Sequence, residues 1–179
     1  MYRVSGQLTG VAPLLINRYT GDPGKGPGGK TSEKKRWEEA KQKAYRGNNG
    51  LYLPSWTFKR VLLDGCGMAG MKRDARRGLS KYLEASVFVE GDLLFGKHEP
   101  DFYHEAMGRI PPRTGGYVPI IRPALETGWQ LPFRLVVLDD TITEEQVRWA
   151  MEEAGVRAGI GAWRPEYGRF VVSEWSLVS

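Results

Sequence analysis

The 179-residue chain has a formal net charge of +5, from 26 Lys and Arg against 21 Asp and Glu, and is 41% hydrophobic. This balance is typical of a globular protein, and no stretch approaches the ~20 consecutive apolar residues that a membrane span needs. The single cysteine, Cys66, excludes an intramolecular disulfide and a cysteine-rich zinc site. We therefore expect a cytoplasmic protein without a membrane partner, whose positive excess suits an anionic one.

The N-terminal part of the chain predicts a strand followed by an insertion. Residues Tyr2–Asn17 alternate between apolar and polar positions and reach an apolar turn at Pro13. The insertion, at about 18–50, combines a glycine- and proline-rich loop with a charged helix over Thr31–Arg46, for which Ser32 is the expected N-cap. The helix is either a solvated charged face or a basic arm laid over a nucleic-acid strand.

The main helix is predicted over Ser55–Met71. Its apolar side chains recur at helical spacing and are expected in the core, namely Phe58, Val61, Leu62 and Cys66. Its small residues are expected to allow close approach to a sheet, namely Gly65, Gly67 and Gly70. The helix is predicted to continue through Lys72–Lys81, the densest basic segment of the chain. Helical spacing would place Arg73, Arg76 and Arg77 on one side, either as a phosphate-binding stripe or as a solvated face.

The middle of the chain predicts short strands and a projecting element. Strands are expected over Ala85–Glu90 and Leu93–Phe95, followed by a hairpin or long loop within 96–124, whose prolines exclude a central strand. Three of its side chains suit stacking and phosphate contact, namely Arg113, Tyr117 and Arg122. Its two histidines, His98 and His104, lack the spacing of a helical zinc pair, so surface positions are expected and no metal site is predicted.

The C-terminal part predicts a strand, a helix, a glycine-rich loop and a last strand. The strand covers Trp129–Leu138, and Thr143 with Gln146 forms a capping box for a helix over Glu144–Ala154. That helix is expected to bury Val147, Ala150, Met151 and Ala154. The loop, Gly155–Phe170, combines glycines with aromatic and arginine side chains, which suits close approach to phosphates and unstacked bases, although it could equally shape a tight connection with its aromatic rings in the core. The last strand is Arg169–Val178.

This order of elements indicates an α+β protein of the ferredoxin-like, or RRM-like, βαββαβ type. Two helices would cover one face of the sheet. The loop and helix are inserted after the first strand, and the hairpin projects before the fourth, the strand at Trp129–Leu138. We expect a single domain over residues 1–179, with insertions at about 18–50 and 96–124.

Three segments resemble the RAMP superfamily, the RRM-like proteins of CRISPR systems. Residues 8–17, Leu-Thr-Gly-Val-Ala-Pro-Leu-Leu-Ile-Asn, are similar to that group's first strand and its Pro-Leu-Leu turn. Residues 53–60, Leu-Pro-Ser-Trp-Thr-Phe-Lys-Arg, are similar to its Pro-Ser-x-x-Lys-Gly helix start, with Arg60 in place of the glycine. Gly159-Ile-Gly161 followed by Tyr167-Gly168-Arg-Phe170 resembles its glycine-rich loop, with Phe170 at the usual final glycine.

The resemblance implies a role in nucleic-acid binding. The layout is similar to the backbone subunits of CRISPR effector complexes, which bind a single strand along a filament, and the departures suggest a divergent relative, such as a phage or mobile-element protein. Some of those subunits cut RNA with an aspartate in the first loop and a divalent metal, a place that Asp22 could occupy. The repeat-processing enzymes of the superfamily commonly use a histidine near the first helix, whereas no histidine precedes His98 here.

Three functional hypotheses remain open. The first is non-catalytic, sequence-independent binding of single-stranded DNA or RNA by a homo-oligomer or filament, without a cofactor. The second is an RNA endonuclease that uses Asp22 or His104, and the third is a structural subunit whose aromatic and basic loops meet another protein. The predicted nucleic-acid-binding residues are Lys72, Arg73, Arg76, Arg77, Arg113, Tyr117, Arg122, Gly159, Gly161, Trp163, Arg164, Tyr167 and Arg169.

Overall fold

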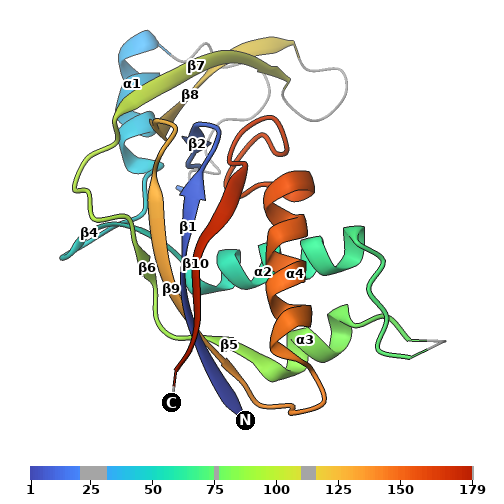
Figure 1. Ribbon diagram of the computed structural model, residues 1–179. Coiled ribbons are helices and arrows are strands. Elements are labelled where there is room, and N and C mark those ends of the chain that lie inside the picture. Colours follow the sequence, from blue (N-terminus) through green and yellow to red (C-terminus); the bar gives the residue numbers. More distant parts are fainter. Residues whose placement is uncertain (21–31, 75–76, 110–115, 179) are drawn as a thin grey trace.

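A four-stranded antiparallel sheet forms the centre of the protein. The computed structural model describes residues 1–20, 32–74, 77–109 and 116–178. The sheet consists of β1 (Tyr2–Gly10), β5 (Val87–Val89), β9 (Gln130–Val137) and β10 (Phe170–Val178). Its strand order is β10-β1-β9-β5, so the first and last strands in the chain lie side by side (Figure 1).

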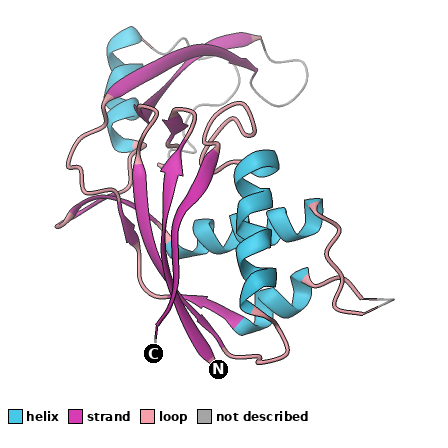
Figure 2. Ribbon diagram, in the orientation of Figure 1, coloured by secondary structure: helices cyan, strands magenta, loops and turns pink. Residues whose placement is uncertain are grey.

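The helices that connect these strands cover one face of the sheet (Figure 2). They are α2 (Ser55–Met68) and α3 (Ser80–Ser86) before β5, and α4 (Glu144–Glu153) with the π-helical turn η1 (Ala154–Ala158) before β10. The α+β, ferredoxin-like arrangement expected from the sequence is thus confirmed. The third strand of that arrangement is β9, whereas β6 (Leu93–Leu94) joins a small separate sheet with β3 (Arg46–Gly47) and β4 (Gly50–Leu53).

The core lies between the sheet and the helices because alternate strand residues point at them. In β9, Leu131, Phe133 and Leu135 are buried while the residues between them are exposed. The predicted core residues of α2 and α4 are all buried, Cys66 included. Thr143 accepts a hydrogen bond from the backbone amide of Gln146 and the Gln146 side chain accepts one from that of Thr143, which confirms the predicted capping box.

The glycines of α2 serve a different contact from the expected one. A side chain at Gly65 would collide with the backbone oxygen of Ala150 and with Ala154, so Gly65 allows α4, rather than the sheet, to cross α2 closely. Gly67 is exposed. Gly70 has φ +64 just after the helix, and this left-handed turn ends it.

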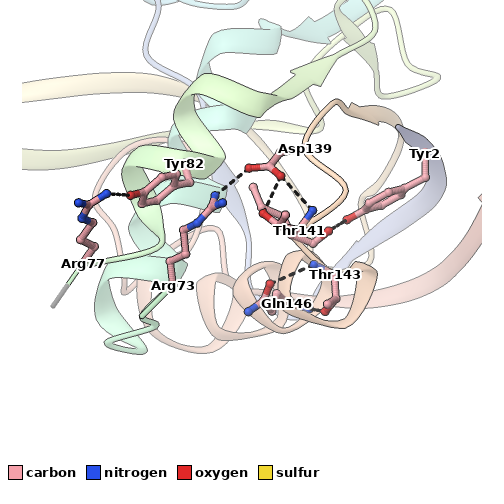
Figure 3. A network of polar contacts seen from close by, with 9 residues as sticks. Tyr2, Arg73, Arg77, Tyr82, Asp139, Thr141, Thr143 and Gln146 are labelled. Carbon is pink, nitrogen blue, oxygen red and sulfur yellow. Dashed lines mark hydrogen bonds and ion pairs between the residues drawn. The ribbon is translucent and has the colours of Figure 1, made fainter. Parts of the chain in front are cut away.

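The described residues between α2 and α3, up to 74 and from 77 to 79, are not helical, so the prediction of one continuous basic helix over Lys72–Lys81 is wrong. Lys72 instead pairs with Gly78 across an isolated antiparallel bridge, and the backbone amide of Arg73 donates to Arg77 O. The connection is fastened by side chains (Figure 3): Arg73 pairs with Asp139 at 2.7 Å and stacks over the ring of Tyr82, whose hydroxyl accepts from Arg77.

A hairpin projects from the end of the sheet where β1 stops (Figure 1). It consists of β7 (Phe102–Arg109) and β8 (Tyr117–Leu125), and the two-residue strand β2 (Leu14–Leu15) pairs with the base of β8. Helix α1 (Glu33–Gln42), capped by Ser32 as predicted, packs against the hairpin through Trp37, whose ring meets Tyr103 edge-on. The hairpin therefore rests on β2 and α1.

No helix within the described ranges is long and apolar enough to span a membrane.

Candidate nucleic-acid interface

The glycine-rich loop between η1 and β10 is fixed to the turn that follows β1. The amide of Ala162 donates to Leu15 O and that of Gly168 to Pro13 O, both at 2.8 Å. A Cβ at Gly161, where φ is +87, would collide with Leu15, so this close approach requires glycine. Gly159, at φ +68, turns the chain out of η1. These contacts fix the backbone of the loop and therefore the positions from which its side chains project.

One side of the loop forms an aromatic cluster with the hairpin. The Tyr167 hydroxyl lies 2.9 Å from His104 Nε2, and the Trp163 ring meets the His104 imidazole edge-on. Trp163 has φ 54, a strained left-handed backbone for a bulky residue, which costs about 1–3 kcal/mol and tends to occur at functional sites. The Arg122 guanidinium lies 4.5 Å from the centre of the Trp163 ring.

The cluster is electropositive and partly enclosed. Arg122 is only 8% exposed, its Nε and Nη1 have no hydrogen-bond partner, and burial lowers its pKa. Lys43 donates to the backbone oxygen of Ile121 at 3.2 Å, and its pKa is lowered by burial and by the nearby charge of Arg122. The His104 imidazole has Nε2 engaged by Tyr167 and Nδ1 buried, so in this arrangement it has no open nitrogen for taking a proton from a substrate.

The other side of the loop borders a pocket of about 290 Å³ at the start of α2. Its walls are largely apolar and include Leu14, Leu53 and Val61. Trp56 stands at the rim, and 65% of its surface is exposed to solvent. Such an exposed indole beside an apolar pocket is a feature of binding surfaces.

Two arginines at the same rim are held by one carboxylate. Arg60 Nε lies 3.1 Å from Asp64 Oδ1, and Arg164 Nη1 lies 3.0 Å from Asp64 Oδ2. Arg164 also donates to Gly159 O, which ties its side chain to the loop. Asp64 neutralises only one of the two positive charges. The rim therefore keeps a net positive charge next to an exposed aromatic ring.

The predicted site residues fall into separate regions. The structure brings Arg122, Trp163 and Tyr167 together, with Arg164 on the opposite side of the same loop; Arg169, exposed at the end of the loop, donates to Pro165 O. Tyr117 is exposed at the start of β8. Lys72, Arg73 and Arg77 belong to the connection between α2 and α3, and α3 lies at the other end of the molecule from the hairpin (Figure 1). Asp22, Arg76 and Arg113 lie outside the described residues.

Sequence reasoning missed part of this surface. Trp56 and Asp64 were not singled out, and Arg60 was noted only as a departure from a motif. The available signal was the spacing of these three residues, four positions apart, which places them on one face of the helix, away from the buried Phe58 and Val61. His98 is exposed as expected, but His104 is half-buried in the cluster rather than on the surface.

Within the described ranges, no group of three or more His, Cys, Asp or Glu side chains is placed to hold a metal ion.

Fold and site together define a ferredoxin-like α+β protein with a projecting hairpin and a basic, aromatic surface around a glycine-rich loop. The solved structures similar to it include a chain of "Type III-B Cmr-beta bound to cognate target RNA" (TM-score 0.56, 14% identity) and Cmr6 from Pyrococcus furiosus (TM-score 0.50, 13% identity). They cover 99% and 96% of this chain, which spans 61% of the first and 97% of the second.

At 14% and 13% identity the two likenesses show the fold alone, and for the fold they confirm the resemblance inferred from the sequence. Comparison with family models and with curated proteins gives no match.

Proposed function

We propose that this protein binds single-stranded nucleic acid with little sequence preference, along a path that crosses the rim of the pocket and the glycine-rich loop. The observation that carries the proposal is the exposed Trp56 ring beside Arg60 and Arg164. A base stacks on an aromatic ring whatever its identity, while guanidinium groups attract the phosphates on either side. RNA is the first strand to test, because one of the similar structures is described as bound to RNA.

The binding surface is preformed in this proposal. Asp64 orients both arginines, and the loop that carries Arg164 is hydrogen-bonded to Pro13 and Leu15. Rigid side chains lose little conformational entropy when they bind, which favours affinity. We place Arg169 on the same path and treat Tyr117 as a contact at the far end of the hairpin.

The test is fluorescence anisotropy with labelled strands of about 30 nucleotides, as RNA, DNA and the matching duplex, over a salt series. Trp56→Ala should weaken single-strand binding by about 5-fold to 150-fold, the ratio that corresponds to losing ~1–3 kcal/mol of stacking. Trp149→Ala is the matched control, because Trp149 is 48% exposed on α4. Equal affinities of the two variants, or no binding by the wild type at low salt, would contradict the proposal.

The arginines have a matched control of their own. Arg60→Gln removes a cation paired with the carboxylate four positions later, and Arg157→Gln removes a cation paired with Glu153, the carboxylate four positions earlier. The slope of log affinity against log salt should fall by about 0.7 in Arg60→Gln and stay unchanged in Arg157→Gln.

A structural subunit of a protein complex is the second candidate function. The observation that favours it is β10, which forms one edge of the central sheet and exposes Val171, Leu177 and Val178. The two functions are separable by Trp163→Ala. Loss of self-association with unchanged affinity for nucleic acid would favour the protein-protein role of the loop.

A further inference from the structure

Arg122 occupies an unusual position for a charged side chain. It lies on β8, is more than nine-tenths buried, and has no hydrogen-bond partner for Nε or Nη1. Among the described residues, no carboxylate pairs with it, and burial is the single cause that lowers its pKa. A buried cation without a carboxylate partner, and with unsatisfied N–H donors, destabilises the protein that carries it, so its presence needs a compensating interaction beyond the contact with the Trp163 ring.

The surroundings add positive charge rather than neutralising it. Lys43 donates to the backbone oxygen of Ile121, next to Arg122, and its pKa is lowered by the Arg122 charge more than it is raised by Glu39. His104 lies across the hairpin, paired in register with Arg122. Lys43 and Arg122 thus place two positive charges close together at the hairpin.

Trp163 covers the guanidinium from the side of the loop. The Arg122 guanidinium carbon is 4.5 Å from the ring centre, so the ring lies next to the group that carries the unpartnered N–H donors. The Trp163 side chain is half-buried, so its ring can turn away while the hydrogen-bonded backbone of the loop stays in place. A ligand that offered Trp163 another stacking partner could expose the guanidinium.

We propose that the junction of β8 with the glycine-rich loop is an inner subsite for one phosphate group of the bound strand, held in a two-point contact by Arg122. This rests on the proposed function and deepens it. The planar fork of a guanidinium matches two phosphate oxygens, Lys43 adds a second positive charge, and a base takes the face of Trp163 that Arg122 gives up. The phosphate is an internal phosphodiester or a terminal phosphate, which share the same oxygens.

The proposal predicts opposite changes in two quantities when Arg122 is replaced: the melting temperature of the free protein rises and its affinity for single strands falls. Arg122→Met replaces the charge with an apolar side chain, so the free protein should melt about 2 °C or more above the wild type, while its affinity for single strands falls about tenfold. Arg122→Lys keeps a charge without the fork and should lose affinity without gaining stability. Arg134→Met, an exposed position on β9, is the control and should change neither quantity.

A structural role for Arg122 gives the opposite result. Arg122→Met would then lose its contact with Trp163 and melt lower than the wild type. Unchanged affinity in Arg122→Met, or lower affinity accompanied by lower melting temperature, overturns the proposal. Lower affinity at an unchanged or raised melting temperature supports it.

Affinities for strands of about 10 nucleotides that carry either a 5′-phosphate or a 5′-hydroxyl distinguish an internal phosphodiester from a terminal phosphate. Equal wild-type affinities for the two, both lowered in Arg122→Met, identify an internal phosphodiester. A preference for the 5′-phosphate that disappears in Arg122→Met identifies a terminal one.

A further measurement separates this proposal from the proposed function. Pyrophosphate alone should raise the melting temperature of the wild type more than that of Arg122→Met. If the wild type binds no strand but shows this Arg122-dependent shift, the proposed function fails and the anion subsite stands. If strands bind, but neither the melting-temperature shift caused by pyrophosphate nor the affinity for strands depends on Arg122, the subsite fails and the proposed function stands.

Discussion

Gly65 and Gly67 lie two positions apart on α2, yet only one of them has room for a side chain. A Cβ at Gly65 would collide with the backbone of Ala150, whereas the nearest atom to a Cβ at Gly67 is the Ser80 hydroxyl at 3.9 Å. One helix thus carries a glycine required by the α2–α4 crossing and another that nothing in the packing requires.

This contrast gives opposite expectations for the same substitution. Gly65→Ala should lower the free energy of unfolding by about 1–3 kcal/mol through overpacking against α4. Gly67→Ala should raise it by about 0.5–1 kcal/mol, because alanine loses less backbone entropy than glycine when it is fixed in the last turn of the helix. Urea unfolding of both variants measures the difference, and a stable Gly65→Ala protein would show that the helices can separate without cost.

The same residue scale explains why the binding surface was only partly predictable. Glycines with aromatic and arginine residues around Trp163 point to a ligand from composition alone. The contact of Arg122 with Trp163 and the burial of His104 are set by how the hairpin folds onto the loop, which no local pattern encodes. The identity of Asp64 as the shared partner of two arginines, one of them 100 residues away, is likewise a tertiary fact.

At the scale of elements, the connection between α2 and α3 depends on a few polar contacts (Figure 3). Asp139 accepts from Thr141 and pairs with Arg73, and these contacts lower its pKa from 3.8 to about 2. The folded-state pKa is depressed, so the stabilisation is fully present above about pH 4 and is lost as the pH falls toward 2.

Arg73→Gln should therefore lower the melting temperature at neutral pH, and the gap to the wild type should narrow between pH 4 and pH 2. Its affinity for single strands should equal that of the wild type, because Arg73 is engaged in the fold. Lys72→Gln, an exposed neighbour, is the control for melting. Weaker strand binding by Arg73→Gln at an unchanged melting temperature would restore the phosphate-contact interpretation of this segment.

Most elements could be predicted because their local patterns agree with their surroundings. The alternation in β9, the core spacing of α2 and the capping box at Thr143 each specify one outcome. The helix expected after α2 failed because Gly70 ends it and because Arg73 finds Asp139, 66 residues away, instead of a helical neighbour. The expectation that the strand at Leu93–Phe95 precedes Trp129–Leu138 in the central sheet was wrong as well. A strand of two residues, β6, has too short a pattern of apolar and polar residues to indicate which sheet it joins.

At the scale of the whole molecule, the central sheet has β10 at one edge, with exposed Leu177 and Val178, while the proposed binding surface lies around the loop and hairpin. A copy bound to a strand would thus keep this apolar edge available for a neighbouring copy. This arrangement leaves a surface for the homo-oligomer expected from the sequence.

Mass photometry on strands of increasing length tests this assembly. One copy is expected on a strand of about 10 nucleotides and several on one of about 40, with binding that becomes cooperative as the strand lengthens. Leu177→Lys should remove the cooperativity and leave the affinity for the short strand unchanged. A single copy at every length would limit the protein to binding as a monomer.

The strand order also constrains how the protein acquires its fold during synthesis. Both neighbours of β1 in the sheet, β9 and β10, come from the last third of the chain. At roughly 5–20 residues per second, β1 waits on the order of ten seconds on the ribosome before either partner exists. During that interval Val4 and Leu8 have no sheet to join, so the nascent chain offers a binding site to chaperones until its final segment emerges.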